Sequence, residues 1–375
     1  MTMQINGTSG LVFNDASTQN TAATGFGFKN RIINGNFAIN QRGFSGNITT
    51  LGGGQYTLDR WFGQASQSDK FSVSQNAGSV TPPVGFSNYL GITSTSAYSI
   101  TSGDYFSIKQ SIEGFNTSDL GWGTANASTV TLSFRVYSSL TGTFGGVLQN
   151  AAFNRSYPFT YTISSANTWT TVSVTVAGDT TGTWVGATNG AGLVVIFGLG
   201  VGSSFSGTAG SWAGGNLISA TGATSVVGTN GATFYITGVQ LEKGSTATSF
   251  DYRPYGTELA LCQRYCYLIG RGQASSAQPM GVGYYLDGGT VSSVVSFPIT
   301  MRAAPTLSAT SGTNFYTCYR NGGSDSFDSL SLDISSPNYI GMFNNAQASG
   351  TAGQAGIFFI TSNATSAVVV VSAEL

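Results

Sequence analysis

The sequence predicts an all-β protein in which a short helix joins two β-sandwiches. Only 8% of its 375 residues are charged, whereas 52 are Gly and 12% are aromatic, a balance typical of strands linked by tight turns. Apolar and polar residues alternate along many short segments, as they do in antiparallel sheets with one buried face. The chain is long for a single compact domain, so more than one is expected.

The composition argues against several classes of function. With 14 basic residues, 15 acidic residues and a net charge of −1, the chain lacks the basic surface that neutralises phosphates, so nucleic-acid binding is not expected. Histidine is absent, which removes the commonest general base and the usual metal ligand. Apolar runs such as 192–201 are too short to cross a bilayer, so membrane insertion is not expected.

The cysteines and the first residues indicate the compartment. Three cysteines form no disulfide framework, and Cys262 and Cys266 are spaced like two small buried residues on a helix. Residues 1–13 lack the basic and apolar regions of a signal peptide. An extracellular type of composition without a secretion signal is typical of a virion protein that is assembled in the host cytoplasm and released by lysis.

Residues 1–29 are predicted to form an N-terminal attachment or oligomerisation segment. Apolar and polar residues alternate briefly at its start, and mostly Ser, Thr, Ala and Asn follow. The segment therefore buries too little surface to fold alone. We expect it to pair with another chain or a docking surface; the alternative is a loose tail.

Residues 30–256 are predicted to form a large jelly-roll-like β-sandwich. The alternation is clearest in TLSFRVY, where Leu132, Phe134 and Val136 share one face. No helical period interrupts the strands, which favours a sandwich. The expected strands lie at 71–75, 87–95, 105–114, 129–139, 168–178, 192–202 and 232–242. Long Gly-rich loops, either functional or merely tolerated, are expected at 141–151, 179–191 and 201–231.

The stretch from 235 to 267 connects the two sandwiches. It begins as the closing strand of the first sandwich and continues as an arm with aromatic residues and Pro254, which fixes an extended backbone. A connecting helix is predicted at 257–268, with Thr257 as its N-cap.

Residues 269–375 are predicted to form a second, smaller β-sandwich. Proline residues stand at strand ends, where they do least harm. The expected strands lie at 280–286, 290–299, 305–310, 314–320, 339–345, 356–362 and 366–375.

Three segments resemble bacteriophage tail-fibre and related virion proteins that carry a carbohydrate-binding-module-like jelly roll. They read NRIINGNFAINQRG (30–43), YTLDRWF (56–62) and GVQLEKGSTATSFDYRPYGTELALCQRYCY (238–267). A short β-domain ending in SAEL follows them, and residues 5–23 resemble the head segment of fibre proteins. The region from 63 to 230 matches by pattern only.

The resemblance implies a non-enzymatic homotrimer that recognises host-surface glycans and joins other virion proteins through its N-terminus. Related sugar-binding jelly rolls often hold a structural calcium ion with acidic residues near the first and last strands. Here Ala38, Thr237 and Gly238 stand at those places. The acidic ligands are therefore missing and no cofactor or metal is expected, although main-chain carbonyls alone could still offer oxygens to calcium.

Four aromatic residues are the candidate ligand-binding residues. Trp122, Trp184 and Trp212 lie in Gly-rich loops, and Tyr157 is added to them. Aromatic rings suit the apolar faces of sugar rings. The alternative is that the same rings plug an end of the sandwich or a subunit contact.

Six residues are expected to build the structural joint. Asp59 and Arg60 are expected to form an ion pair beside Trp61, and a second group is expected to tie the arm to the first sandwich. That second group is Asp251, Arg253 and Tyr255.

The leading functional hypothesis is a phage fibre or receptor-binding protein in the virion that attaches to host-surface glycans. The alternative is a structural head or baseplate decoration protein that binds neighbouring virion subunits and no glycan. An enzyme is not expected, because no pair of carboxylates for glycoside cleavage can be placed together from the sequence.

Overall fold

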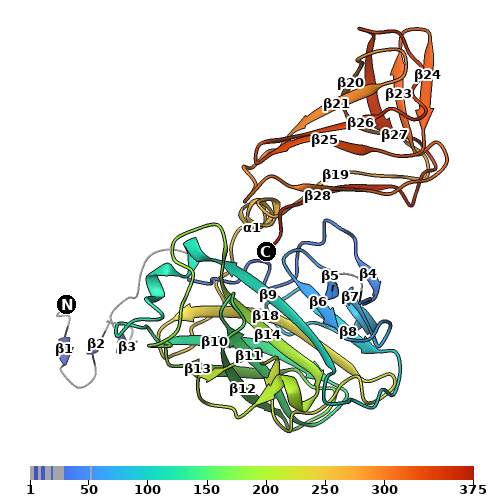
Figure 1. The fold of residues 1–375 in the computed structure, drawn as a ribbon. Helices are drawn as coiled ribbons and strands as arrows, with labels where there is room; N and C mark the ends of the chain where they lie inside the picture. Colours follow the sequence, from blue (N-terminus) through green and yellow to red (C-terminus); the bar gives the residue numbers. More distant parts are fainter. Residues whose placement is uncertain (1–3, 7–9, 13–17, 20–28, 51–52) are drawn as a thin grey trace.

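The computed structural model describes residues 4–6, 10–12, 18–19, 29–50 and 53–375, and it is nearly all β. Figure 1 shows a larger and a smaller sandwich, with α1 (Tyr255–Gln263) between them. The fold class predicted from the sequence is confirmed. Among the described residues, no helix is long and apolar enough to span a membrane.

The first sandwich consists of two packed antiparallel sheets. Its six-stranded sheet has the order β13-β10-β18-β8-β7-β4 and contains β4 (Ser45–Asn47), β7 (Phe71–Gln75), β8 (Leu90–Ser94), β10 (Val130–Ser138), β13 (Thr170–Val176) and β18 (Thr233–Lys243). Its seven-stranded sheet has the order β16-β12-β11-β14-β9-β6-β5 and contains β5 (Gly54–Tyr56), β6 (Phe62–Ala65), β9 (Tyr105–Glu113), β11 (Gly142–Gln149), β12 (Arg155–Ile163), β14 (Ala191–Val201) and β16 (Ala213–Gly214). The short strands β15 (Ser206–Gly207) and β17 (Ser219–Ala220) pair in parallel in the loop after β14.

The core lies between these two sheets. In β10 the alternating residues Leu132, Phe134 and Val136 are buried, as their pattern predicts. Trp61 is fully buried near Phe37, and its indole N–H donates to the main-chain oxygen of Asn34. Burial of apolar side chains, aromatic rings among them, is the dominant favourable contribution to folding.

The segment predicted as a loop at 141–151 is instead largely the strand β11, and its neighbour β12 was not predicted. The glycines concealed β11, because Gly in a strand usually weakens it. Here they are needed for close packing. A Cβ added at Gly146 would lie 2.4 Å from the Ile196 carbonyl oxygen and from the Phe159 ring.

The predicted connecting helix is also shifted. α1 begins directly after Pro254, which takes the N-cap position instead of Thr257. It ends at Gln263, and Cys266, expected near the helix end, begins β19 (Cys266–Arg271). The reason is tertiary: Cys266 pairs with Ser372 of β28 (Val368–Ser372), so sheet formation outweighs the local helical pattern.

The second sandwich packs a small sheet on a large one. The three-stranded sheet has the order β19-β28-β22, where β22 is Thr306–Ala309. The seven-stranded sheet has the order β24-β23-β27-β20-β21-β26-β25 and contains β20 (Gln278–Tyr285), β21 (Val291–Ser296), β23 (Tyr316–Arg320), β24 (Gly323–Phe327), β25 (Ser331–Ser336), β26 (Tyr339–Asn344) and β27 (Ala355–Ile360).

Near the N-terminus, β1 (Gln4–Asn6), β2 (Gly10–Val12) and β3 (Thr18–Gln19) form a three-stranded sheet in that order. The rest of the segment predicted at 1–29, Lys29 excepted, lies outside the described residues. Its role in attachment stays a prediction.

Candidate functional site

The structure brings the four predicted ligand-binding residues together. The rings of Trp122, Trp184 and Trp212 pack edge to face with centroids 4.7 to 5.4 Å apart, and Tyr157 contacts Trp212 at 5.3 Å. Trp122 is buried, whereas the other three rings are half-buried. We call these four residues the indole cluster.

Each indole N–H of the cluster is already used within the protein. Trp122 donates to the Ser128 carbonyl at 2.7 Å, and Trp212 donates to the Ala177 carbonyl at 2.8 Å. Trp184 is 3.3 Å from a carboxylate oxygen of Asp179. The cluster therefore offers a ligand ring faces and no indole donor.

Asp179 fixes the loop that carries Trp184. Its carboxylate accepts two hydrogen bonds from Arg155, at 2.7 and 2.8 Å. Burial alone would raise the pKa of Asp179, but the hydrogen bonds from Arg155, Thr181 and Trp184 outweigh it and hold the pKa below its ordinary value. The carboxylate is therefore ionised at neutral pH.

The indole cluster joins the two sheets at one side of the first sandwich. Trp212 lies just before β16, at the edge of the seven-stranded sheet, and its partner Ala177 directly follows β13, at the edge of the six-stranded sheet. A cavity of only about 70 Å³ lies against Trp122 and Trp184. This packing agrees with the alternative that these rings plug the sandwich, and only the outer parts of Trp184, Trp212 and Tyr157 are exposed to a ligand.

A much larger concavity of about 1010 Å³ lies elsewhere on the first sandwich, and we call it the Arg31 groove. Its volume is at the upper end of the roughly 300–1,000 Å³ of small-molecule sites. Sequence motifs 30–43 and 238–267 supply most of its wall, and Lys29 and residues 115–119 supply the rest. The lining residues are Lys29, Asn30, Arg31, Ile33, Phe115, Asn116, Asp119, Glu242, Lys243, Gly244, Ser245, Thr246, Thr248, Arg253 and Leu261.

Charged residues in this groove are held in place by one another. Arg31 donates two hydrogen bonds to the carboxylate of Asp119, at 2.7 and 2.8 Å. Lys243 donates to the main-chain oxygen of Asp119 at 3.0 Å. The hydrogen bond from Arg31 is the main cause that lowers the pKa of Asp119. About half of the Asp119 and Lys243 side chains remains exposed, at 54% and 48%.

The groove also offers an aromatic surface and hydroxyl groups. Phe115, in the short helical turn η3 (Gly114–Asn116), is 55% exposed. Glu242 accepts hydrogen bonds from both the amide and the hydroxyl of Thr248, and Lys29 donates to the same hydroxyl at 3.1 Å. An exposed ring beside fixed polar groups is the arrangement that recognises a sugar ring with its hydroxyls.

The sequence analysis did not select the groove residues. A signal was present, because Arg31 and Lys243 lie inside two motifs of a chain with very few charges. Asp119 is 88 residues from Arg31 in the sequence, so its place beside them could not be predicted without the fold.

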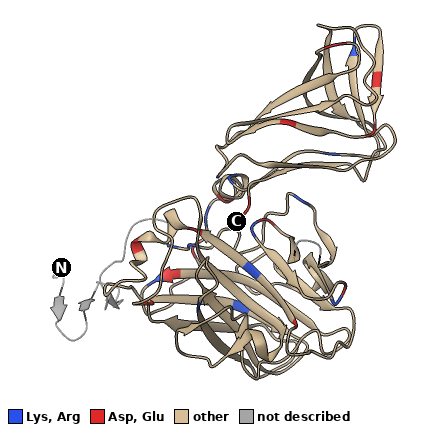
Figure 2. Cartoon of the chain, in the orientation of Figure 1, with Lys and Arg blue, Asp and Glu red and all other residues tan. Residues whose placement is uncertain are grey.

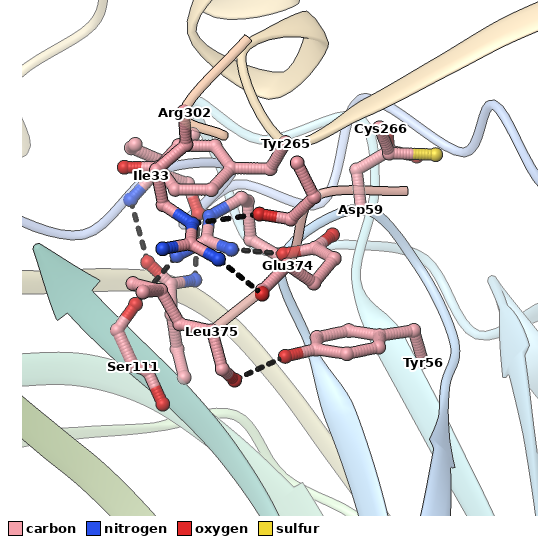
Figure 3. Close-up of polar contacts among 12 residues, drawn as sticks. Ile33, Tyr56, Asp59, Ser111, Tyr265, Cys266, Arg302, Glu374 and Leu375 are labelled. Atoms are coloured by element: carbon pink, nitrogen blue, oxygen red, sulfur yellow. Dashed lines mark hydrogen bonds and ion pairs between the residues drawn. The ribbon is translucent and has the colours of Figure 1, made fainter. Parts of the chain in front are cut away.

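The predicted structural joint centres on Arg60, but its ionic partner differs from the expected one. Arg60 is fully buried and forms an ion pair with Glu374 of the second sandwich, not with the adjacent Asp59. Figure 3 shows Glu374, Arg302 and Tyr265 gathered at this place. The Arg60 guanidinium lies 3.4 Å from the centroid of the Tyr265 ring.

Further hydrogen bonds cross the joint. Tyr56 donates to the main-chain oxygen of Leu375 at 2.5 Å, as Figure 3 shows. Arg264 donates two hydrogen bonds to Glu113 at 2.7 and 3.0 Å, and Tyr265 donates to the same carboxylate. The two sandwiches are therefore connected by buried polar contacts as well as by the chain.

The other joint residues lie mainly within the first sandwich. Asp59 accepts two 2.6 Å hydrogen bonds from Gln41; burial nevertheless raises its pKa. Asp251 accepts hydrogen bonds from the main-chain N–H groups of Lys29 and Asn30. Arg253 forms an ion pair with Glu258 at 3.1 Å. Tyr255, expected to tie the arm to the first sandwich, is instead 64% exposed as the first residue of α1.

The positions discussed for calcium hold no acidic side chain. Thr237 uses its hydroxyl to donate to the Asn88 carbonyl at 2.7 Å, and Gly238 has a positive φ of 61°. Within the part of the chain that the structure describes, no three His, Cys, Asp or Glu side chains are grouped to bind a metal ion. The absence of a cofactor stays a prediction.

No family model and no curated protein matches the sequence. Similar solved structures include the enzymatically active domain of a tailspike protein from bacteriophage CBA120, with a TM-score of 0.31 and 12% identity over 57% of this chain. The match spans 21% of that tailspike chain.

Two bacterial proteins are matched over nearly their whole length. A putative sugar binding protein from Bacteroides thetaiotaomicron has a TM-score of 0.34 and 15% identity, over 58% of this chain and 100% of the other. A family 11 carbohydrate-binding module from Clostridium thermocellum has a TM-score of 0.27 and 11% identity, over 55% and 99%. Similarities this distant carry no argument about the ligand of this chain.

Proposed function

We propose that this protein is a bacteriophage attachment protein whose first sandwich binds host-surface glycan in the Arg31 groove. The proposal includes a homotrimer in the virion, joined to other virion proteins through the N-terminal segment. The observation that carries the glycan proposal is the exposed Phe115 ring beside the hydrogen-bonded Arg31, Asp119 and Lys243.

The physical reason lies in the chemistry of sugars. A pyranose has an apolar face that packs on an aromatic ring, and hydroxyl groups that both donate and accept hydrogen bonds. Phe115 supplies the ring, Asp119 accepts, and Lys243 donates. Arg31 holds Asp119 in position, which reduces the entropy lost on binding. The fibre-like motifs at 30–43 and 238–267 line the same groove, which supports the proposal further.

The test is titration of the purified full chain with polysaccharides from candidate host surfaces, first on a glycan array and then by calorimetry. Phe115→Ala should weaken binding about tenfold, which corresponds to about 1.4 kcal/mol. Phe153→Ala is the matched control, because Phe153 is 44% exposed on the same sandwich but outside the groove, and it should bind normally.

Several results would contradict the proposal. Binding that survives Phe115→Ala but is lost in Trp184→Ala would move the site to the indole cluster. Binding to virion subunits without any glycan binding would support the head or baseplate decoration protein. Release of reducing ends from the polysaccharide would make the protein an enzyme. A monomer in mass measurements at micromolar concentration would contradict the homotrimer.

A further inference from the structure

The seven-stranded sheet of the second sandwich has an apolar outer face. Its inner face packs on the three-stranded sheet through residues such as Cys318, Phe358 and Met342. Large apolar side chains nevertheless also occupy the opposite face and remain exposed. They are Tyr319 (56%), Ile357 (51%), Val282 (65%), Tyr284 (41%), Val294 (49%), Ile334 (50%) and Tyr339 (37%), and we call them the outer sheet face.

The strand register makes the outer sheet face continuous. Tyr319 of β23 pairs with Ile357 of β27, which in turn pairs with Val282 of β20. The pairing of Gly283 with Ser293 brings Val282 beside Val294 of β21. Across β26, both Val294 and Ile334 are opposite Gly341, so the row reaches the far edge of the sheet.

Such a face is unusual for a sheet in contact with water. Antiparallel sheets with one solvated face normally place polar residues on that face. Here Ser and Thr are the polar neighbours, and the one charge at these outward positions is Asp333 in the bulge of the edge strand β25. Figure 2 shows how sparse the charges are on the second sandwich. An exposed apolar face this large indicates an interaction surface.

We propose that the outer sheet face packs against the same face of other copies of this chain. Seven side chains exposed by about half, at an order of 200 Å² for a large side chain, give roughly 700 Å², which approaches the ~800 Å² that a stable complex buries per partner. Identical faces whose one charge, Asp333, lies in the edge strand repel one another little, and interfaces between identical subunits are the more apolar ones. A lipid surface would instead call for Lys and Arg around the apolar residues, which this face lacks.

The inference does not depend on glycan binding, because the Arg31 groove lies on the other sandwich. The test is the mass of the full chain in solution. The wild type should be an oligomer of the 38.7 kDa chain in sedimentation and light scattering at micromolar concentration. The double variant Val294→Glu with Ile357→Glu should shift entirely to the monomer mass, because its carboxylates would meet like charges in every copy.

Two controls keep the test independent of folding. Val84→Glu places the same charge at a fully exposed apolar position of the first sandwich, and Leu332→Glu places it in β25 opposite the inward-facing Met342. Both should remain oligomeric. A milder variant, Tyr284→Ser with Tyr319→Ser, should also weaken the oligomer and retain the melting temperature of the second sandwich.

A monomeric wild type, or a double variant that stays oligomeric, would overturn the inference. A dimer upholds the contact between copies but contradicts the homotrimer of the proposed function. Glycan titration separates the two proposals: the double variant should still bind glycan monovalently, and Phe115→Ala should remain an oligomer.

Discussion

Asp179 connects β12 with the loop that carries Trp184 through one carboxylate. It accepts hydrogen bonds from Arg155 in β12 and from Trp184 in the indole cluster, and it is 2% exposed. Both of its carboxylate oxygens are used, because Arg155 donates to each of them. The hydrogen bonds of this carboxylate therefore fix the loop that carries Trp184 against β12.

Asp179→Asn should lower the free energy of unfolding by about 1–3 kcal/mol, because Arg155 loses its charged acceptor. The pKa of Asp179 is lowered in the folded state, so its stabilisation is complete above the ordinary carboxyl pKa of about 4 and is lost as the pH falls through the lower folded value. Urea unfolding from pH 7 to pH 3 measures both effects.

In the same measurements the variant should lose less stability than the wild type between pH 5 and pH 3. Asp69→Asn is the control, because Asp69 is exposed in a turn, and it should follow the wild type. An Asp179→Asn variant with the wild-type pH dependence would show that this carboxylate does not control the loop.

At the scale of residues, the sequence shows which side chains are candidates for a site better than it shows which residues they contact. The tryptophans of the Gly-rich loops could be singled out as one group, and the structure does bring them together. The partner of Arg60 could not be predicted, because Glu374 is 314 residues away. Local spacing favoured Asp59, whereas burial of the guanidinium requires a counter-ion that faces it.

At the scale of elements, β18 shows how one glycine shapes both a strand and the arm that follows it. The register of β10 with β18 shifts between Ser133 and Arg135, which places an extra residue in β18. Gly238 takes a φ of 61° there, as glycine does in a β-bulge. The Phe86 ring fills the space beside it and packs on Phe250 of the arm at 5.1 Å.

Gly238→Ala should therefore destabilise the protein by about 2–3 kcal/mol, through the left-handed backbone and the contact with Phe86. Its Cβ would lie 2.6 Å from the Phe86 ring. The midpoint of urea unfolding measures the loss. Gly46→Ala is the matched strand control, because no atom lies within 4 Å of its added Cβ, and it should change the midpoint little. Equal midpoints in the two variants would contradict the role of the bulge.

The elements that the sequence predicted well are those with strict alternation, such as β10 and β13. β11 was missed because its glycines, which the packing requires, resemble those of a loop. The helix end was misplaced because Cys266 belongs to a sheet whose other strands lie far along the chain. In each case a contact distant in sequence outweighed the local pattern.

At the scale of the whole molecule, residues near 374 hold the two sandwiches together. Figure 1 places the end of the chain between the sandwiches. There Glu374 contacts Arg42 and Arg60 of the first sandwich, and Arg302 of the second sandwich donates to the main-chain oxygen of Glu374 at 2.9 Å. Two sandwiches and a short helix could be predicted from sequence patterns, but not the angle at which these contacts fix them.

Glu374→Gln tests whether this joint makes the two sandwiches one body. The Glu374 side chain is 3% exposed and the Arg60 side chain 1%, so loss of the carboxylate leaves a guanidinium charge buried without its counter-ion. Breaking a buried pair in this way costs about 3–5 kcal/mol. That cost falls on the contact between the sandwiches and not on either core. The single unfolding transition expected of the wild type should therefore separate into two in calorimetry, and the radius of gyration from small-angle X-ray scattering should increase as the sandwiches move apart.

Asp287→Asn, in an exposed loop of the second sandwich, should change neither quantity. A variant that keeps one transition and the wild-type scattering curve would show that the covalent connection through α1 alone sets the angle.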